Sequence, residues 1–232
     1  MEQTPRERAR RQTMEDIVRI GREHLATEGA AALSLRAVAR DLGVVSSAVY
    51  RYVKSRDELL TLLVIDGYTG LGDAVDAAVA TVPEHDFRAQ FRALGRAVRA
   101  WAVGEPARYG LLFGSPVPGY QAPAEQTTGP GTRVIGQLVR IIEGAHRAGG
   151  LRPGDGPVEA NERLTADFAA IRGELGLTVN DDTMARCVLV WAALFGAVNF
   201  EVFGQYGQTT FSDPAALFEA HLSSLERLAG FN

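Results

Sequence analysis

A short stretch between residues 46 and 54 carries the side chains best suited to binding nucleic acid. It holds two serines, two tyrosines, an arginine and a lysine. Hydroxyl, guanidinium and ammonium groups donate hydrogen bonds to phosphates and base edges, and small residues allow a close approach. The candidate contact residues in this stretch are Ser46, Ser47, Ala48, Tyr50, Arg51, Tyr52 and Lys54.

Two short helices around a glycine turn are expected to position these side chains. The first helix is expected to begin at Ser34, whose side chain we expect to cap it, and to end at Gly43, where glycine adopts a left-handed conformation at little cost. The second begins at Ser46, and its apolar residues Val49 and Val53 can pack back on the first. One face of the first helix is apolar and consists of Leu35, Val38, Ala39 and Leu42. The pattern predicts a helix-turn-helix, in which the second helix enters the major groove. An ordinary helical hairpin with a solvated outer face is the alternative.

The flanking sequence extends this pattern. A helix is predicted over residues 13–28, with Thr13 as its cap, and Ser55 with Glu58 forms a capping box for a long helix that follows. The run VYRYVKSRDELL, with the glycine turn and the upstream helix, resembles the TetR family of transcriptional regulators over roughly residues 13–64. A second run, PARYGLLFGSP, is similar to an effector-domain segment of the family branch with a WHG-like C-terminal domain.

The resemblance assigns roles to individual side chains. It implies that Arg36 reads a base, with guanine the natural partner of an arginine. Val45 and Ala48 replace residues that are polar in some relatives, so thymine methyl groups are plausible partners for them. Ser34 and Arg51 belong to the same expected surface. The remaining roles are contacts to bases or phosphates for Ser46 and Ser47, and to phosphates for Tyr50, Tyr52 and Lys54.

Composition places the chain among globular proteins. The sequence has 232 residues, of which 46% are hydrophobic and 22% charged, with a net charge of −4. This balance argues against a protein that coats nucleic acid nonspecifically, and the small basic excess lies within the first 60 residues. Cys187 is the only cysteine, so an intrachain disulfide is impossible. The apolar run 187–200 is short for a membrane span, which needs ~20 residues, and we expect a cytoplasmic protein without membrane contact.

A search for catalytic and metal-binding patterns predicts neither an enzyme nor a cofactor. The sequence lacks a nucleophile elbow, a phosphate loop and a dinucleotide fingerprint. The four histidines are widely separated, at positions 24, 85, 146 and 221. Glu143 and His146 have the spacing of carboxylate-bridged metal bundles, but the second copy that such a site needs is missing. We therefore assign no catalytic residue and no metal ligand.

The rest of the chain is predicted to be all-α, with a DNA-binding domain over residues 1–56 and an effector-binding and dimerisation domain over residues 57–232. Residues 1–12 are expected to be either a polar tail or an arm that reaches DNA. Glycines 67, 70 and 72 suggest a bend or a close backbone contact in the fourth helix. Proline and glycine dominate residues 114–131, which predicts a loop.

The last two long helices, about 182–203 and 213–229, are rich in apolar residues. The first is apolar nearly all round and is expected to be capped by Asp181 or Asp182. Exposure of both stripes on a monomer would leave a large apolar patch, which favours a homodimer. The family resemblance implies that these helices pair with their symmetry mates in a four-helix bundle.

Aromatic side chains are frequent after residue 60, and most are expected to be core residues. In TetR-like proteins the helical domain encloses an apolar ligand pocket with a few polar groups. The residues assigned to this pocket are Tyr68, Phe91, Trp101, Arg108, Tyr109, Phe113, His146, Trp191, Phe195 and Asn199.

The combined prediction is a homodimeric repressor that binds a pseudo-palindromic operator in double-stranded DNA and is released by a small apolar effector. Two alternatives remain from the sequence. One is a DNA-binding protein that acts without a ligand. The other is a helical ligand-binding or enzymatic bundle that merely carries a helix-turn-helix.

Overall fold

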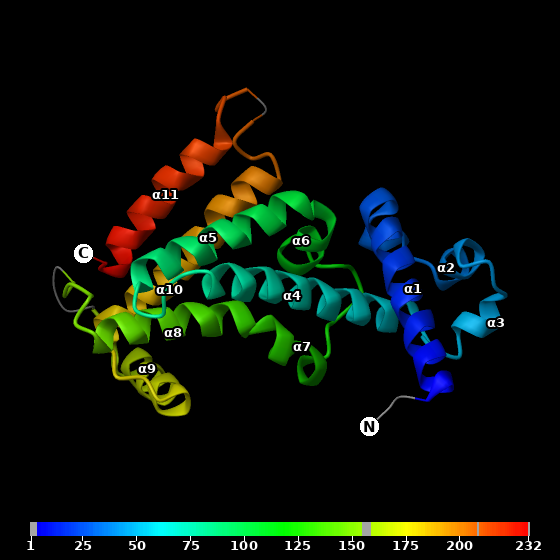
Figure 1. Cartoon of the computed structure of the whole chain (residues 1–232), viewed down its shortest axis with the longest axis horizontal. Coiled ribbons are helices and arrows are strands. Elements are labelled where there is room, and N and C mark those ends of the chain that lie inside the picture. The colour runs from blue at the N-terminus through cyan, green and yellow to red at the C-terminus, as the bar shows by residue number, and fades with distance from the viewer. Residues whose placement is uncertain (1–3, 155–158, 208, 232) are drawn as a thin grey trace. The chain divides into compact units, whose positions relative to one another are not determined.

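The computed structural model describes residues 4–154, 159–207 and 209–231, and these residues form helices without any strand, as predicted (Figure 1). A single isolated β-bridge joins Leu151 to Phe231. The helices are α1 (Pro5–Glu28), the 3-10 turn η1 (Ala30–Ala32), α2 (Leu35–Asp41), α3 (Ser46–Val49), α4 (Arg56–Ala80), α5 (Phe87–Gly104), α6 (Pro106–Phe113), α7 (Ala124–Gly131), α8 (Arg133–Arg147), α9 (Glu162–Leu175), α10 (Asp181–Val202) and α11 (Pro214–Ala229).

The chain forms two compact units. Unit 1 comprises Met1–Gly72 and Gly104–Thr132, and unit 2 comprises Asp73–Val103 and Arg133–Asn232. The boundary between these two compact units falls within α4, and α6 and α7 belong to the same unit as α1–α3. The domain boundary predicted at residue 56 is a functional one, between the DNA-contacting residues and the effector-binding residues. It stays a prediction.

The N-terminal helix begins earlier than the sequence indicated. Thr4 is its cap, and its side chain and that of Glu7 form a reciprocal capping box, with Pro5 at the first helical position. Thr13 lies inside the helix and donates to the carbonyl of Ala9 over 2.9 Å. The predicted cap at Thr13 is therefore wrong. Residues 5–12 are helical and so are not an irregular tail, and a contact between them and DNA stays a prediction. Residues 1–3 lie outside the described part of the chain.

Unit 1 has an apolar core in which α1, α2, α3 and α4 meet. Ile17 and Ile20 of α1, Val38 of α2 and Leu63 of α4 are almost completely buried, and Leu33 and Leu35 close the cluster as predicted. Burial of each such side chain stabilises the fold by about 1.5–3 kcal/mol. This core fixes the two short helices of the predicted DNA-binding motif.

Helix α4 begins with the predicted cap, since the backbone N–H of Glu58 donates to Oγ of Ser55 over 3.1 Å. The Glu58 carboxylate accepts from the N–H of Lys54, one residue before the position that a capping box requires. The helix continues through its three glycines. At Gly67 a β-carbon would lie only 3.2 Å from Leu112 of α6, so this glycine permits the close contact that the sequence suggested.

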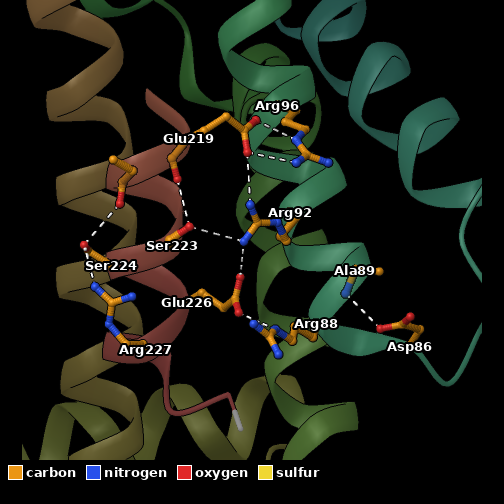
Figure 2. Close-up of polar contacts among 11 residues, drawn as sticks. Asp86, Arg88, Ala89, Arg92, Arg96, Glu219, Ser223, Ser224, Glu226 and Arg227 are labelled. Carbon is orange, nitrogen blue, oxygen red and sulfur yellow. Dashed lines mark hydrogen bonds and ion pairs between the residues drawn. The ribbon is translucent and has the colours of Figure 1, made fainter. Parts of the chain in front are cut away.

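In unit 2, α5 packs against α11 through both apolar and charged contacts. A β-carbon at Gly95 would lie 2.6 Å from Leu222, so the two helices approach closely there. Figure 2 shows the charged contacts along the same pair: Arg96 donates to Glu219 over 2.7 Å, and Arg92 to Glu226 over 2.6 Å. Arg88 also pairs with Glu226, whose side chain is nearly fully buried. Two arginines thus compensate one buried carboxylate.

Two other local predictions need correction. The proline- and glycine-rich segment before residue 132 contains α7, because Pro123 precedes the helix and the Thr127 hydroxyl donates to its carbonyl over 2.9 Å. The cap of α10 is Asn180 rather than Asp181 or Asp182. Its side-chain oxygen accepts from the N–H of Thr183 over 2.9 Å. Asparagine caps a helix as well as aspartate, so composition could not separate these neighbours.

Candidate nucleic-acid interface and apolar cavity

Helices α2 and α3 form a helix-turn-helix whose turn depends on Gly43. This glycine has φ = 73°, a left-handed conformation that other residues rarely adopt. The N–H of Val44 then returns to the carbonyl of Ala39 over 3.0 Å and closes the turn. Val49 and Val53 are buried against the unit 1 core, so α3 presents its other side to solvent. Ser34 occupies the cap position of α2, but its side chain makes no capping hydrogen bond among the described residues, so that prediction is wrong.

The residues predicted to contact DNA lie on the outer side of this motif. Val45 is 72% exposed, which is unusual for an apolar side chain. The exposed members of the set are Arg36, Val45, Ser47, Tyr50, Arg51 and Lys54. The half-buried members are Ser34, Ser46, Ala48 and Tyr52. Each predicted residue is therefore at least partly accessible on α2 or at its cap position, on α3 or in the turns beside α3.

Two interactions near the end of α3 were not predicted from the sequence. The ammonium group of Lys54 donates to the carbonyls of Tyr50 and Arg51 over 3.0 and 3.2 Å, which places its charge at the carbonyl end of α3. The guanidinium group of Arg10 lies 5.7 Å from the ring centre of Tyr52, a cation–π distance. The first turns of α1 therefore reach the turn that follows α3. The spacing of the arginines at residues 6–11 could have indicated the contact with Tyr52 only if the predicted first helix had begun at Pro5 instead of Thr13.

A buried histidine joins α1 to α2. Nε2 of His24 lies 2.6 Å from Oδ2 of Asp41, and the His24 side chain is almost fully buried. The hydrogen bonds from His24 and from Arg40 hold the pKa of the Asp41 carboxyl below its ordinary value. The carboxylate is therefore charged at neutral pH and holds the motif against α1.

Four of the predicted effector contacts lie in unit 1 and pack with one another or with α4. Tyr109 is fully buried, and burial raises the pKa of its hydroxyl. The ring of Phe113 lies 5.0 Å from that of Tyr109 and 6.2 Å from that of Tyr68. Arg108 is paired with Asp66 over 2.9 Å, and Asp66 is also paired with Arg22 of α1.

The other six lie in unit 2. Phe91 is fully buried and stacks on Phe231, with ring centres 5.4 Å apart. Trp191 and Phe195 form a tilted pair at 4.3 Å. The side chains of Trp101, His146 and Asn199 are half-buried.

A cavity of about 270 Å³ lies between α8, α9 and α10. Of the residues predicted to bind the effector, Trp191 lines it, and the others lie outside its lining. Glu143 and Cys187 are the only members of the lining that are not ordinary hydrophobic residues. The lining consists of Ile135, Val139, Ile142, Glu143, Ile171, Leu175, Leu177, Val179, Met184, Cys187, Val188 and Trp191. No group of three or more histidine, cysteine, aspartate or glutamate side chains that could hold a metal ion occurs among the described residues.

An exposed apolar stripe runs along another side of α10. Leu189 is 53% exposed and Phe200 is 47% exposed, and the small residues Ala193, Gly196 and Ala197 lie between them. With His221 and Ser224 of α11, part of this stripe borders a groove of about 360 Å³. By length and hydropathy, α10 is also the one helix of the described chain that could cross a membrane, although only 33% of that window is buried.

These features define a class: an all-α protein with an N-terminal helix-turn-helix and a larger helical C-terminal part. Comparison with known families agrees. The profile described as "Bacterial regulatory proteins, tetR family" matches residues 13–63, and that described as "Tetracyclin repressor-like, C-terminal domain" matches residues 91–225.

Individual relatives give the same result. The chain is 48% identical over 212 residues to the HTH-type transcriptional regulator Rv1816 of Mycobacterium tuberculosis (strain ATCC 25618 / H37Rv), covering 91% of this chain and 90% of the relative. Among solved structures, the regulatory protein SCO4313 is 34% identical, with a TM-score of 0.75 and coverage of 96% and 98%. A TetR-family protein from Rhodococcus RHA1 shares the fold at 18% identity, with a TM-score of 0.62 and coverage of 94% and 97%. The chain therefore belongs to the TetR family of bacterial transcriptional regulators, a family of DNA-binding proteins and not of enzymes.

Proposed function

We propose that this regulator is a homodimeric repressor that binds a pseudo-palindromic operator and leaves it when a small apolar effector occupies the C-terminal domain. The observation that carries the proposal is the pair of unpartnered surfaces: a polar one on α2 and α3, and an apolar one on α10. The first suits DNA, and the second suits a second copy of the chain.

The apolar stripe of α10 supports the homodimer. Leu189, Ala193, Gly196 and Phe200 recur every three or four residues, so they lie on one side of the helix. Small residues in the middle of such a stripe allow another helix to approach closely. A second copy would cover the stripe and remove it from water, contributing about 25 cal/mol per Å² of apolar surface. This also accounts for the membrane-like hydropathy of α10 in a protein that we place in the cytoplasm.

Two helix-turn-helix motifs in one dimer would read two half-sites. The two copies of α3 should enter successive major grooves about 34–36 Å apart. Arg36 is then the candidate for base readout, and Tyr50 and Arg51 the candidates for phosphate contact. Release follows if the effector binds the arrangement with the wrong half-site spacing more tightly than the competent one.

The first experiment is selection of genomic DNA fragments by the full-length protein, followed by footprinting at physiological salt. The proposal expects one protected pseudo-palindrome with half-sites one helical turn apart, bound by two copies of the chain. Reporter expression from the selected fragment should rise when the gene for the regulator is deleted. Binding without a preferred sequence, or expression that falls on deletion, would overturn the repressor assignment.

A further inference from the structure

The cavity between α8, α9 and α10 offers a ligand almost nothing but hydrocarbon. Ile135 and Val139 line it from α8, Ile171 and Leu175 from α9, and Met184, Val188 and Trp191 from α10. Every one of these side chains is neutral. A charged or strongly polar ligand would lose its hydration here without gaining partners, at a cost of several kcal/mol.

The single carboxylate of the lining is not available to a ligand. Glu143 accepts from the backbone N–H of Thr178 over 3.0 Å, from the Thr178 hydroxyl over 2.6 Å and from Arg147 over 2.6 Å. Its charge is therefore compensated by Arg147 of α8, and Thr178, between α9 and α10, donates the other hydrogen bonds. The thiol of Cys187 is neutral too, because burial raises its pKa to about 12.

The size of the cavity allows a ligand larger than benzene. An enclosed apolar cavity of about 150 Å³ stays dry and binds benzene. The present cavity, at about 270 Å³, has room for a larger molecule. It also lies near the lower end of the range for ligand pockets, ~300–1,000 Å³.

The cavity is distinct from the surface assigned to the dimer. Successive residues of an α-helix differ by about 100° in direction, so Trp191 and Ala193 project from nearly opposite sides of α10. Trp191 lines the cavity, whereas Ala193 borders the groove next to α11. The lining residues of the two features do not overlap. A second copy of the chain on the stripe would leave the cavity open.

Helix α9 covers the cavity and is held by few contacts. Phe168 is its only buried residue, and Arg172 pairs with Asp181 at the start of α10. Ile171 and Leu175, which line the cavity, remain 39% and 54% exposed. An apolar molecule would bury more of both side chains and would tie α9 to α10, the helix that carries the proposed dimer surface.

We propose that this cavity is the effector site of the regulator and that it takes an uncharged, largely hydrocarbon molecule larger than benzene, such as a medium-chain alcohol. The regulatory part of this inference rests on the proposed function. The site differs from the one predicted from the sequence, since of that residue set Trp191 belongs to it.

Tryptophan fluorescence can detect a ligand in this cavity. The chain has two tryptophans, and Trp191 lines the cavity whereas Trp101 does not. The probe is 10-bromodecanol, whose bromine quenches tryptophan fluorescence only at short range, and 10-bromodecanoate is its charged counterpart. We expect saturable quenching of the full-length protein by the alcohol, retained in Trp101→Phe and lost in Trp191→Phe. The acid should bind at least tenfold more weakly at neutral pH. Quenching that persists in Trp191→Phe, equal affinity for the acid, or no quenching would overturn the site.

A pair of matched substitutions keeps this test independent of folding. Val139→Trp fills the cavity from α8, and Val103→Trp makes the same change at an exposed position of α5 outside its lining. Displacement of tritiated decanol measures the affinity of each variant for the alcohol. We expect this affinity to fall at least tenfold in Val139→Trp and to stay within twofold of the native value in Val103→Trp. Loss in both, or in neither, would contradict the assignment.

The regulatory step is measured separately on the selected operator fragment. Decanol should weaken operator binding by the native chain at least tenfold and leave binding by Val139→Trp unchanged. Ligand binding without any effect on the operator would overturn the effector role. Failure of the unliganded chain to select an operator would instead defeat the proposed function, and the quenching result would still stand.

Discussion

At the scale of single residues, the hydrogen bonds of Glu143 determine the pKa of its carboxyl group. Burial by itself would raise the pKa of its carboxyl, but the hydrogen bonds from Thr178 and Arg147 outweigh it and hold the pKa below the ordinary value. A group whose pKa is lowered in the folded state stabilises the fold above its unfolded pKa. That stability is lost as the pH falls through the folded value.

We predict that Glu143→Gln lowers the free energy of unfolding by about 1–3 kcal/mol at pH 7, because the charged acceptor of three hydrogen bonds is removed. The native protein should lose this advantage on acidification below about pH 4.5, the ordinary carboxyl value. Urea unfolding at pH 7 and pH 4 measures both effects. Glu174→Gln, at an exposed position of α9, is the control and should be nearly neutral.

The proposed DNA contacts make a second prediction at this scale. Arg36→Ala should cost ~1–3 kcal/mol of operator binding and relax the sequence preference, since a bidentate base contact is lost. Lys54→Ala should weaken all sequences alike, partly because its ammonium group also holds the end of α3. Binding isotherms on the operator and on a scrambled duplex separate the two effects. Equal losses on both duplexes for Arg36→Ala would refute base readout.

At the scale of elements, glycine residues allow two helices to approach each other closely. Alanine normally stabilises a helix interior by about 0.5–1 kcal/mol relative to glycine. At Gly95, however, the added β-carbon would meet Leu222, whereas no described residue has an atom within 4 Å of a β-carbon at Gly136.

The two glycines should therefore respond in opposite directions. Gly95→Ala should destabilise unit 2 by about 1–3 kcal/mol through overpacking between α5 and α11. Gly136→Ala, inside α8, should stabilise it by about 0.5–1 kcal/mol. Denaturant unfolding of both variants tests the difference. A gain in stability for Gly95→Ala would mean that α5 and α11 have room to separate.

At the scale of the whole molecule, the exposed stripe of α10 matters most. Leu189 and Phe200 stay about half exposed in one copy of the chain, although Phe200 contacts the ring of Tyr206. A pseudo-palindromic operator also needs two copies of the helix-turn-helix. Assembly and DNA binding should therefore fail together when the stripe is charged.

We expect Phe200→Glu to convert the dimer to a monomer and to weaken operator binding at least tenfold, because two like charges would meet at the symmetric interface. Light scattering after size-exclusion chromatography gives the mass. Val103→Glu, a similarly exposed apolar position outside the stripe, serves as the control. A native chain that is already monomeric at micromolar concentration would contradict the proposed assembly.

Much of this protein was determined by sequence alone, because its signals are local. Helix periodicity, Gly43, the cap at Ser55 and the apolar faces of the unit 1 core depend on neighbours within a few residues, and each was predicted correctly. The same periodicity indicated an all-α chain, and the assignment of the surface around α3 to DNA stays a prediction. The start of α1 was missed because Thr4 and Thr13 are equally good caps by type.

The tertiary structure decided what depends on distant residues. The fold pairs Arg108 with Asp66 of α4 and buries Tyr109 beside Phe113, and the predicted role of both in effector binding stays a prediction. The cavity is lined by three helices, and its one carboxylate, on Glu143, accepts hydrogen bonds from Thr178, 35 residues away. Long-range packing of this kind leaves no periodic signal in the sequence, so only the fold could show the cavity that we propose as the effector site.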